Sequence, residues 1–232
     1  MSADKAFFGD IEVAEIIKSP RRTIGLSLRD DAALIVRAPK RATMEAIKNA
    51  VLKNRDWIIR KKELISRQFS EAKPHSFSES ETFYFLGNPC KLAFPENARS
   101  FFNPDTGFSI SARYRESARQ MFIAWYIRQA NSIIPARASF FSEKSQLRYN
   151  RIKITSADKR WGSCSPEKNL SFSWKLVFAP LEVIDYVVVH ELSHIKEMNH
   201  SRNYWNTVRQ ILPGFETQKR WLKENGHKIS AF

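Results

Sequence analysis

The chain has 232 residues, of which 43% are hydrophobic and 12% aromatic, so it is long and apolar enough to bury a sizeable core. This composition excludes a disordered chain, and only two cysteines, Cys90 and Cys164, exclude a disulfide framework. No stretch approaches the roughly 18 apolar residues of a membrane-spanning helix. The first residues also lack the pattern of a signal peptide, so we expect a cytoplasmic protein with no membrane partner.

The charge is strongly basic, with 38 Lys and Arg against 24 Asp and Glu, a net +14 and a pI near 9.9. Such a charge attracts anions, so nucleic acid is one predicted partner of the basic surface. The alternative is a solvated basic surface with no dedicated partner, because net charge guides the approach of charged molecules but does not define a binding site.

In the first half of the chain we expect short strands, then one long helix, then further short strands. Apolar alternation predicts strands over residues 24–28 and 34–36, and Thr43 is a suitable N-cap for a basic helix over residues 43–71. A Ser-rich linker over 73–81 and two hairpins up to residue 110 follow. We therefore expect an α+β fold, with residues 1–110 as an N-terminal region and residues 111–232 as a catalytic domain.

The second half contains longer elements. We expect a helix over residues 113–133 that Pro135 breaks or kinks, and strands over 151–155 and 169–176, the latter a candidate edge strand for aligning a peptide. Three C-terminal helices complete the expected fold. The first starts with Pro180 at its first position and passes through His190 and His194. The other two cover residues 201–212 and 215–225, and Gly226 is expected to end the last one.

The first of these helices carries the pattern H-E-x-x-H, at His190, Glu191 and His194. Side chains four residues apart share one helix face, so both imidazoles can bind the same metal ion, for which Zn²⁺ is the expected cofactor. Glu191 is rotated about 100° from that face, a position that suits a general base acting on water at the metal. The alternative is a helix with two unrelated histidines and an incidental glutamate.

A third metal ligand is expected at His200, six residues after His194, because three imidazoles with one open position are typical of catalytic zinc. Metzincins have the same spacing but with a Gly at the position of Glu197. Here Asn199, which tolerates left-handed geometry, is expected to make the turn instead. Glu216 and Glu224 remain alternative carboxylate ligands.

A second cluster, Arg160-Trp161-Gly162-Ser163-Cys164-Ser165, lies between two predicted strands. Its glycine and serines suit a simple tight turn. In the functional interpretation the turn flanks the metal cleft, with Arg160 binding an anionic group and Ser163 or backbone amides holding substrate. Tyr204 is more typical of a core residue, although its hydroxyl is a candidate contact to a developing oxyanion.

These segments resemble the YgjP-like family of zinc-dependent hydrolases, usually labelled metallopeptidases. The likeness covers nearly the whole chain and is carried by the motifs Arg21-Arg22-Thr23-Ile24-Gly25-Leu26, Val36-Arg37-Ala38-Pro39, Trp57-Ile58, Leu86-Gly87, the cluster at 160–165, Pro180, the run from Ile184 to His194, Asn199-His200-Ser201, Trp205, Pro213 and Trp221-Leu222-Lys223. The resemblance implies an α+β fold with a minimal zincin core. It also implies His190, His194 and His200 as metal ligands and Glu191 as the catalytic residue.

Three functions follow from these observations. The first is a zinc metallopeptidase acting on peptides. The family label favours it, and the related SprT and WLM groups include proteases that act on DNA-bound proteins. The second is hydrolysis of nucleoside triphosphates such as UTP, an activity ascribed to members of the family, for which Arg160 and Arg202 are candidate phosphate contacts. The third is a nucleic-acid-binding module with structural zinc, in which Glu191 would have no purpose. The oligomeric state is not predicted by any of these features.

Overall fold

The computed structural model describes residues 6–29, 31–71, 75–98, 101–157 and 160–230. The chain forms two compact units, residues 1–73 and residues 74–232. The expected boundary at residue 110 differs from this division, because the hairpins between residues 82 and 110 belong to the second unit. Among the helices that the structure describes, none combines the length and the apolar character needed to cross a bilayer.

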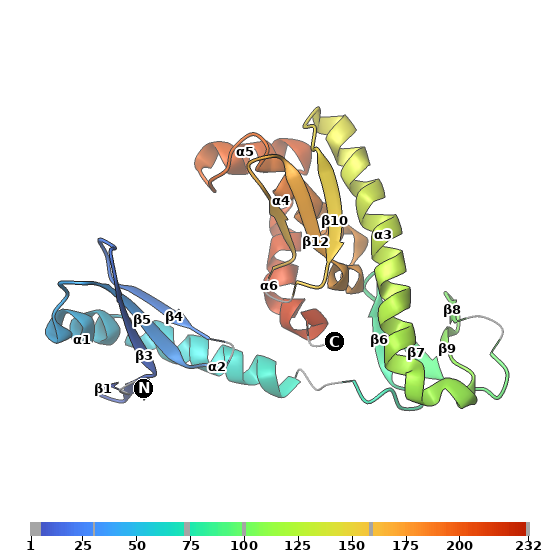
Figure 1. Cartoon of the computed structure of the whole chain (residues 1–232), viewed down its shortest axis with the longest axis horizontal. Coiled ribbons are helices and arrows are strands. Elements are labelled where there is room, and N and C mark those ends of the chain that lie inside the picture. Colours follow the sequence, from blue (N-terminus) through green and yellow to red (C-terminus); the bar gives the residue numbers. More distant parts are fainter. Residues whose placement is uncertain (1–5, 30, 72–74, 99–100, 158–159, 231–232) are drawn as a thin grey trace. The chain divides into compact units, whose positions relative to one another are not determined.

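The first unit is a small α+β body (Figure 1). A three-stranded sheet has the order β3-β5-β4, with β3 parallel and β4 antiparallel to the central strand, and β1 and β2 form a separate hairpin. The elements are β1 (Ala6–Phe8), β2 (Ile11–Val13), β3 (Glu15–Ser19), β4 (Gly25–Leu28), β5 (Leu34–Pro39), α1 (Met44–Lys53) and α2 (Arg55–Glu71).

Two helices replace the single helix predicted over residues 43–71. Thr43 is the N-cap, as expected, and its side chain accepts a hydrogen bond from the Ala46 amide at 3.2 Å. Asn54 ends the first helix, outside helical geometry at φ −105° and ψ 16°. Apolar residues at helical spacing, Ile47, Val51 and Ile58, are fully buried in the core of this unit.

The second unit is built around α3 (Ala118–Ser145), a continuous helix that passes through Pro135 where the sequence predicts a break or kink. Its strands and short helices are β6 (Thr82–Phe85), β7 (Asn88–Ala93), β8 (Phe102–Asn103), β9 (Gly107–Ser109), η1 (Ala112–Ser117), β10 (Arg151–Thr155), β11 (Gly162–Cys164), β12 (Asn169–Ser173) and η2 (Trp174–Phe178). Its remaining helices are α4 (Leu181–Ser193), α5 (Arg202–Ile211) and α6 (Glu216–Ser230).

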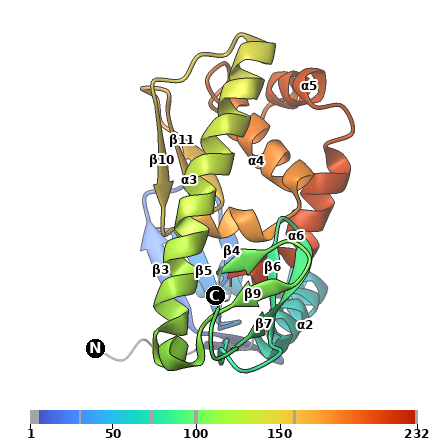
Figure 2. The ribbon, with the colours of Figure 1, turned by 90° about the vertical axis from the view of Figure 1, so that its right-hand side faces the viewer.

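Two sheets lie along α3 (Figures 1 and 2). One has the strand order β6-β7-β9-β8, and its Phe83 and Phe108 pack with Phe122 of α3 in an aromatic cluster. The other has the order β10-β12-β11, with β10 parallel and β11 antiparallel to the central β12. The strand predicted over 169–176 ends at Ser173, because the chain then turns into η2.

The β6–β7 hairpin fixes the start of α4. Its turn lies at Leu86 and Gly87, both with positive φ (50° and 80°), the geometry of a type I′ turn. The amides of these two residues donate to the carbonyls of Val177 and Phe178, at 2.9 and 3.1 Å. A Cβ at Gly87 would lie 2.7 Å from the Pro180 ring, so glycine is required for this close approach. Pro180 is the N-cap of α4, one position before the predicted one.

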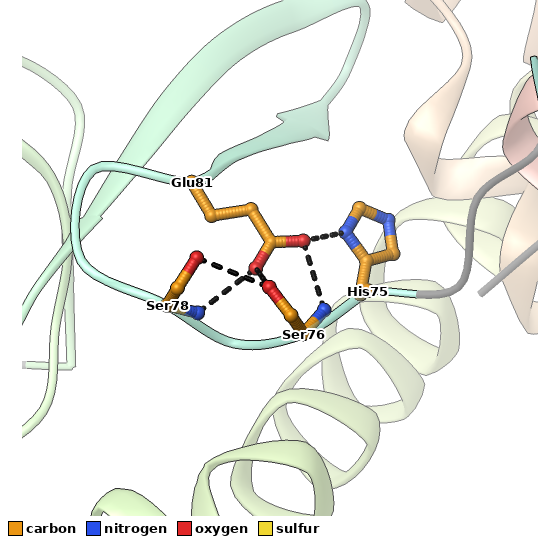
Figure 3. Close-up of polar contacts among 4 residues, drawn as sticks. All are labelled: His75, Ser76, Ser78 and Glu81. Atoms are coloured by element: carbon orange, nitrogen blue, oxygen red, sulfur yellow. Dashed lines mark hydrogen bonds and ion pairs between the residues drawn. The ribbon is translucent and has the colours of Figure 1, made fainter.

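The predicted Ser-rich linker is ordered where the structure describes it; Lys73 and Pro74 lie outside the described residues. Figure 3 shows the Glu81 carboxylate accepting hydrogen bonds from the amides of Ser76 (3.2 Å) and Ser78 (2.9 Å) and from the Ser76 hydroxyl (3.0 Å). His75 Nδ1 lies 2.8 Å from the same carboxylate. Burial raises the pKa of Glu81, but these hydrogen bonds outweigh it and leave the pKa below its usual value of 4.5.

Candidate metal centre

Helix α4 is held rigidly in the second unit. Its apolar positions, among them Ile184, Val188 and Leu192, are fully buried. One charged residue, Asp185, faces α3, where Arg137 donates two hydrogen bonds to its carboxylate at 2.5 and 2.7 Å. This bidentate pair satisfies the buried charge and fixes the helix that carries the H-E-x-x-H pattern.

The three expected histidines come together. His190 lies in the last turn of α4, His194 is the C-cap of that helix, and their ring centroids are 5.1 Å apart. The His200 ring lies 5.0 Å from that of His190 and 4.8 Å from that of His194. The candidate ligand atoms all lie within 4.8 Å of one another. Glu216 and Glu224 are not part of this group, and Glu216 instead pairs with Arg209 at 2.8 Å.

The chain turns between His194 and His200 without a residue in left-handed geometry, and side-chain hydrogen bonds hold this turn. The Asn199 side chain accepts from the Ser201 amide at 2.9 Å and donates to the Glu197 carboxylate at 2.8 Å. Asn199 does not have a positive φ, so the expected left-handed turn there is wrong. Ser201 then caps α5, accepting from the Tyr204 amide at 3.3 Å. Glu197, where metzincins have Gly, thus takes part in the turn.

Tyr204 supports the histidines. Its side chain is fully buried, and its hydroxyl donates to the backbone carbonyl of His190 at 2.9 Å. Its ring lies 4.6 Å from the His194 ring and 4.8 Å from the His200 ring. A buried hydroxyl already used in this way is not available to substrate, so the expected oxyanion contact does not fit this placement.

The geometry of the three imidazoles fits a tetrahedral metal ion. Nε2 of His190 and Nε2 of His200 are 3.2 Å apart. Two nitrogen ligands of tetrahedral zinc, each at 2.0–2.1 Å from the ion, are about 3.3 to 3.4 Å apart. His194 Nδ1 lies 3.1 Å from the Glu197 carbonyl, so an N–H there can donate to it and leave Nε2 as the ligand atom.

His190 and His194 are also in the neutral form that metal ligands require. Burial, with the charges of His194, His200 and Lys219, lowers the pKa of His190 to about 3. Its Nδ1 is buried with no hydrogen-bond partner among the described residues, which disfavours a charged ring further. Burial, opposed by the Glu197 carbonyl and helped by His200, lowers the pKa of His194.

Glu191 is buried, with 5% of its surface exposed, and packs under strand β11. A Cβ at Gly162 would lie 2.6 Å from its Cγ and 2.7 Å from its Oε1, so only glycine leaves space for this side chain. Burial raises the pKa of Glu191 to about 7, and the charge of Arg160 opposes that rise. The cluster at 160–165 is therefore a short strand beside the carboxylate and not a simple turn.

Strand β11, and not the predicted residues 169–176, lies at the edge of the sheet next to α4. β12 is the central strand, hydrogen-bonded on both sides. Gly162 and Cys164 pair with Phe172 and Leu170, whose side chains face the core, so Ser163 points to the opposite face, away from Glu191. The Ser163 side chain is therefore not placed beside the metal ligands, although its backbone lies on the edge strand.

Cys164 is not a member of the histidine group. Burial, together with the negative charge of Glu191, raises the pKa of its thiol to about 11. A neutral thiol is a poor metal ligand, which agrees with a packing role for this cysteine.

Lys219 belongs to no motif recognised in the sequence, and α6 places it next to the histidine group. The His200 ring stacks on Trp205, with centroids 5.7 Å apart and 26° between planes, and Phe215 stacks on the same indole at 5.5 Å and 6°. Lys219 Nζ lies 3.8 Å from the centre of the Trp205 ring. Helix α6 continues through Gly226, which packs near the Trp161 indole and does not end the helix as predicted.

Comparison with known proteins gives a family match over most of the chain. The family model described as YgjP-like, metallopeptidase domain, matches residues 22–225. A comparison with curated proteins finds no match.

Two solved structures are similar to part of this chain. The metallopeptidase zymogen abylysin of Pyrococcus abyssi is 17% identical, with a TM-score of 0.36 over 39% of this chain and 93% of its own. The metallopeptidase zymogen jannalysin of Methanocaldococcus jannaschii is 24% identical, with a TM-score of 0.35 over 39% of this chain and 91% of its own. Neither likeness covers more than 39% of this chain, and no function is transferred from them.

Proposed function

Because the chain belongs to the YgjP-like family of metallopeptidase domains, we propose that it is a zinc-dependent peptidase with His190, His194 and His200 as metal ligands and Glu191 as general base. The observation that carries the proposal is the convergence of three imidazoles beside a buried carboxylate. Zinc bound there would supply a Lewis acid that acidifies water and polarises a carbonyl.

Glu191 has the properties of a group that accepts a proton and then returns it. Its pKa of about 7 lies near neutral pH, where a general base transfers protons most effectively. Gly162 holds no side chain against the carboxylate, so the backbone of β11 approaches the reacting centre closely. In the proposed reaction Glu191 removes a proton from the attacking water and delivers it to the leaving amine.

The edge of β11 is the proposed place for an extended peptide. Among the described strands it pairs only with β12, so its outer edge has free backbone groups. A peptide added as a further strand there would run beside α4 and Glu191. Arg160, two residues before this strand, is exposed and its charge reaches Glu191, so it remains our candidate for binding an anionic substrate group.

Nucleotide hydrolysis would need several cations around the histidines. Arg160 is one such cation, and Arg202, the second expected phosphate contact, is exposed at the first position of α5. The family match also names a metallopeptidase domain. We therefore propose the peptidase alone, while binding of nucleic acid stays a prediction from net charge.

A substrate panel tests this proposal. The zinc-loaded protein is incubated with unfolded β-casein and, separately, with the four nucleoside triphosphates. We expect peptide fragments that disappear when zinc is removed with a chelator and return when it is restored, with no release of phosphate or pyrophosphate. Zinc-dependent release of phosphate or pyrophosphate with intact casein would refute the peptidase proposal.

A further inference from the structure

Helix α6 places a cation next to the histidine group. Lys219 Nζ lies 3.8 Å from the centre of the Trp205 ring. That ring in turn lies 5.7 Å from the His200 ring and 6.0 Å from the His190 ring. The ammonium and two of the proposed ligands therefore surround one indole.

The position of Lys219 is fixed by its neighbours. Phe215, the residue immediately before α6, stacks on Trp205, and the Lys219 amide donates to its carbonyl, so Lys219 lies one turn further on and faces the same indole. A cation over an indole face is an attractive arrangement that holds the ammonium in place.

Lys219 forms no ion pair with any described residue. The carboxylate nearest along its helix, Glu216, feels the charge of Lys219 but forms its ion pair with Arg209, at 2.8 Å. Lys219 is exposed, oriented over the indole and unpaired among the described residues, so its ammonium is available to a ligand.

We propose that Lys219 binds a carboxylate of the peptide substrate close to the scissile bond, which makes it a specificity-determining residue of the proposed peptidase. The inference rests on the proposed function. An extended peptide advances about 3.3 Å per residue, so a carboxylate one to three residues from the scissile bond falls within reach of the ammonium. The carboxylate belongs either to an acidic side chain or to the C-terminus of the peptide.

Matched peptides separate these two sources. The peptide that the enzyme cleaves fastest in a β-casein digest is resynthesised as matched pairs. Three pairs have Glu or Gln at one of the three positions after the scissile bond. A fourth pair ends two residues after that bond with a free or an amidated C-terminus. We expect the wild-type protein to prefer the carboxylate member of one pair by roughly tenfold or more in kcat/KM.

Variants of Lys219 test whether this residue causes the preference for a carboxylate. Lys219→Met keeps the aliphatic stem on Trp205 but removes the charge, and we expect the preference to fall to within about twofold of unity. Lys219→Arg keeps the charge and is expected to retain most of it. Lys223→Met removes a charge one turn further along the same helix and serves as the matched control, with the preference unchanged.

A binding measurement supplies a readout independent of turnover. In a Glu191→Gln background, calorimetry with the same peptides is expected to show tighter binding of the carboxylate member, and loss of that difference with Lys219→Met. Zinc content and melting temperature establish that each variant is folded and loaded.

The outcomes are distinct. If the wild-type protein cleaves peptides but shows no carboxylate preference, or if Lys219→Met retains it, the assignment of Lys219 is wrong while the peptidase proposal stands. An equal loss in Lys223→Met would show a general field effect and would also overturn the assignment. If no peptide is cleaved, the proposed function itself fails.

Discussion

The two units of the chain differ in the kind of residues that they bury. The first unit, residues 1–73, buries apolar side chains of its short strands and of helices α1 and α2, and it contains neither histidine nor cysteine. The second unit contains all five histidines and both cysteines, and it buries Glu191, Asp185 and His194 among apolar neighbours. In the second unit burial also shifts the pKa values of the groups that we propose for metal binding and catalysis.

The match to the family model nevertheless includes residues of both units. The matched region begins at residue 22, inside the first unit, and ends at residue 225 in α6. The first unit is therefore a regular part of the family's domain. From this difference between the units, we expect substitutions in the first unit to change stability alone. Substitutions around the histidine group of the second unit should change zinc binding or turnover.

The largest expected effect is the loss of a metal ligand. His200→Ala should weaken zinc binding by more than about 100-fold, because outer partners of zinc ligands alone are worth 10–100-fold. Competition with a zinc-sensitive chelating dye measures the affinity. Glu216→Gln is the matched control, since Glu216 pairs with Arg209 outside the histidine group, and it should bind zinc normally. A loss in the control and not in His200→Ala would mean that the third ligand is misassigned.

The next largest effect is expected at Gly162. A methyl group there would lie 2.7 Å from Glu191 Oε1 and must displace the carboxylate, and misplacing a catalytic group by about 1 Å costs on the order of 100-fold in rate. We expect Gly162→Ala to keep its zinc and to lose turnover in a peptide assay. Gly226→Ala is the control, because its methyl group would contact the Trp161 indole at an ordinary 3.4 Å. Similar rates in both variants would argue against close packing of β11 on the base.

Tyr204→Phe should have a smaller effect. The change removes the hydrogen bond to the His190 carbonyl but leaves the ring beside His194. We expect a loss of about 1 kcal/mol in the free energy of unfolding, measured by urea denaturation, with a modest decrease in zinc affinity. If Tyr204 instead contacts substrate, the stability will be unchanged and KM or kcat will move alone.

The smallest effect on function is expected in the first unit. Thr43→Ala removes the N-cap of α1 and should destabilise that unit by about 1 kcal/mol. Zinc affinity and the rate of peptide cleavage should not change under conditions where both units are folded. A coupled loss of zinc binding would contradict the separation of roles between the units.

The sequence predicts the local part of the site well. The i and i+4 spacing of His190 and His194 is a property of one helix, and the group formed with His200 agrees with the spacing argument. The α+β class and the buried face of α1 also follow from local patterns. In each case the information lies within a few turns of chain.

What the sequence does not reveal depends on contacts between distant segments. β11 has only three residues and contains a glycine, so its period cannot be recognised, and the reason for Gly162 becomes visible only with Glu191 packed against it. The unit boundary was expected too late because the hairpin amides of Leu86 and Gly87 bind carbonyls some ninety residues ahead, at Val177 and Phe178. Lys219 has no local signal beyond its spacing from Phe215.

The central claim is that Glu191 acts as the base at a zinc centre formed by His190, His194 and His200. The most direct test compares initial rates of casein cleavage by the wild-type protein and Glu191→Gln, both shown to carry one equivalent of zinc. The account predicts that the variant is slower by 10²–10⁴-fold, the usual contribution of a general acid–base group. Equal rates at equal zinc content would contradict it.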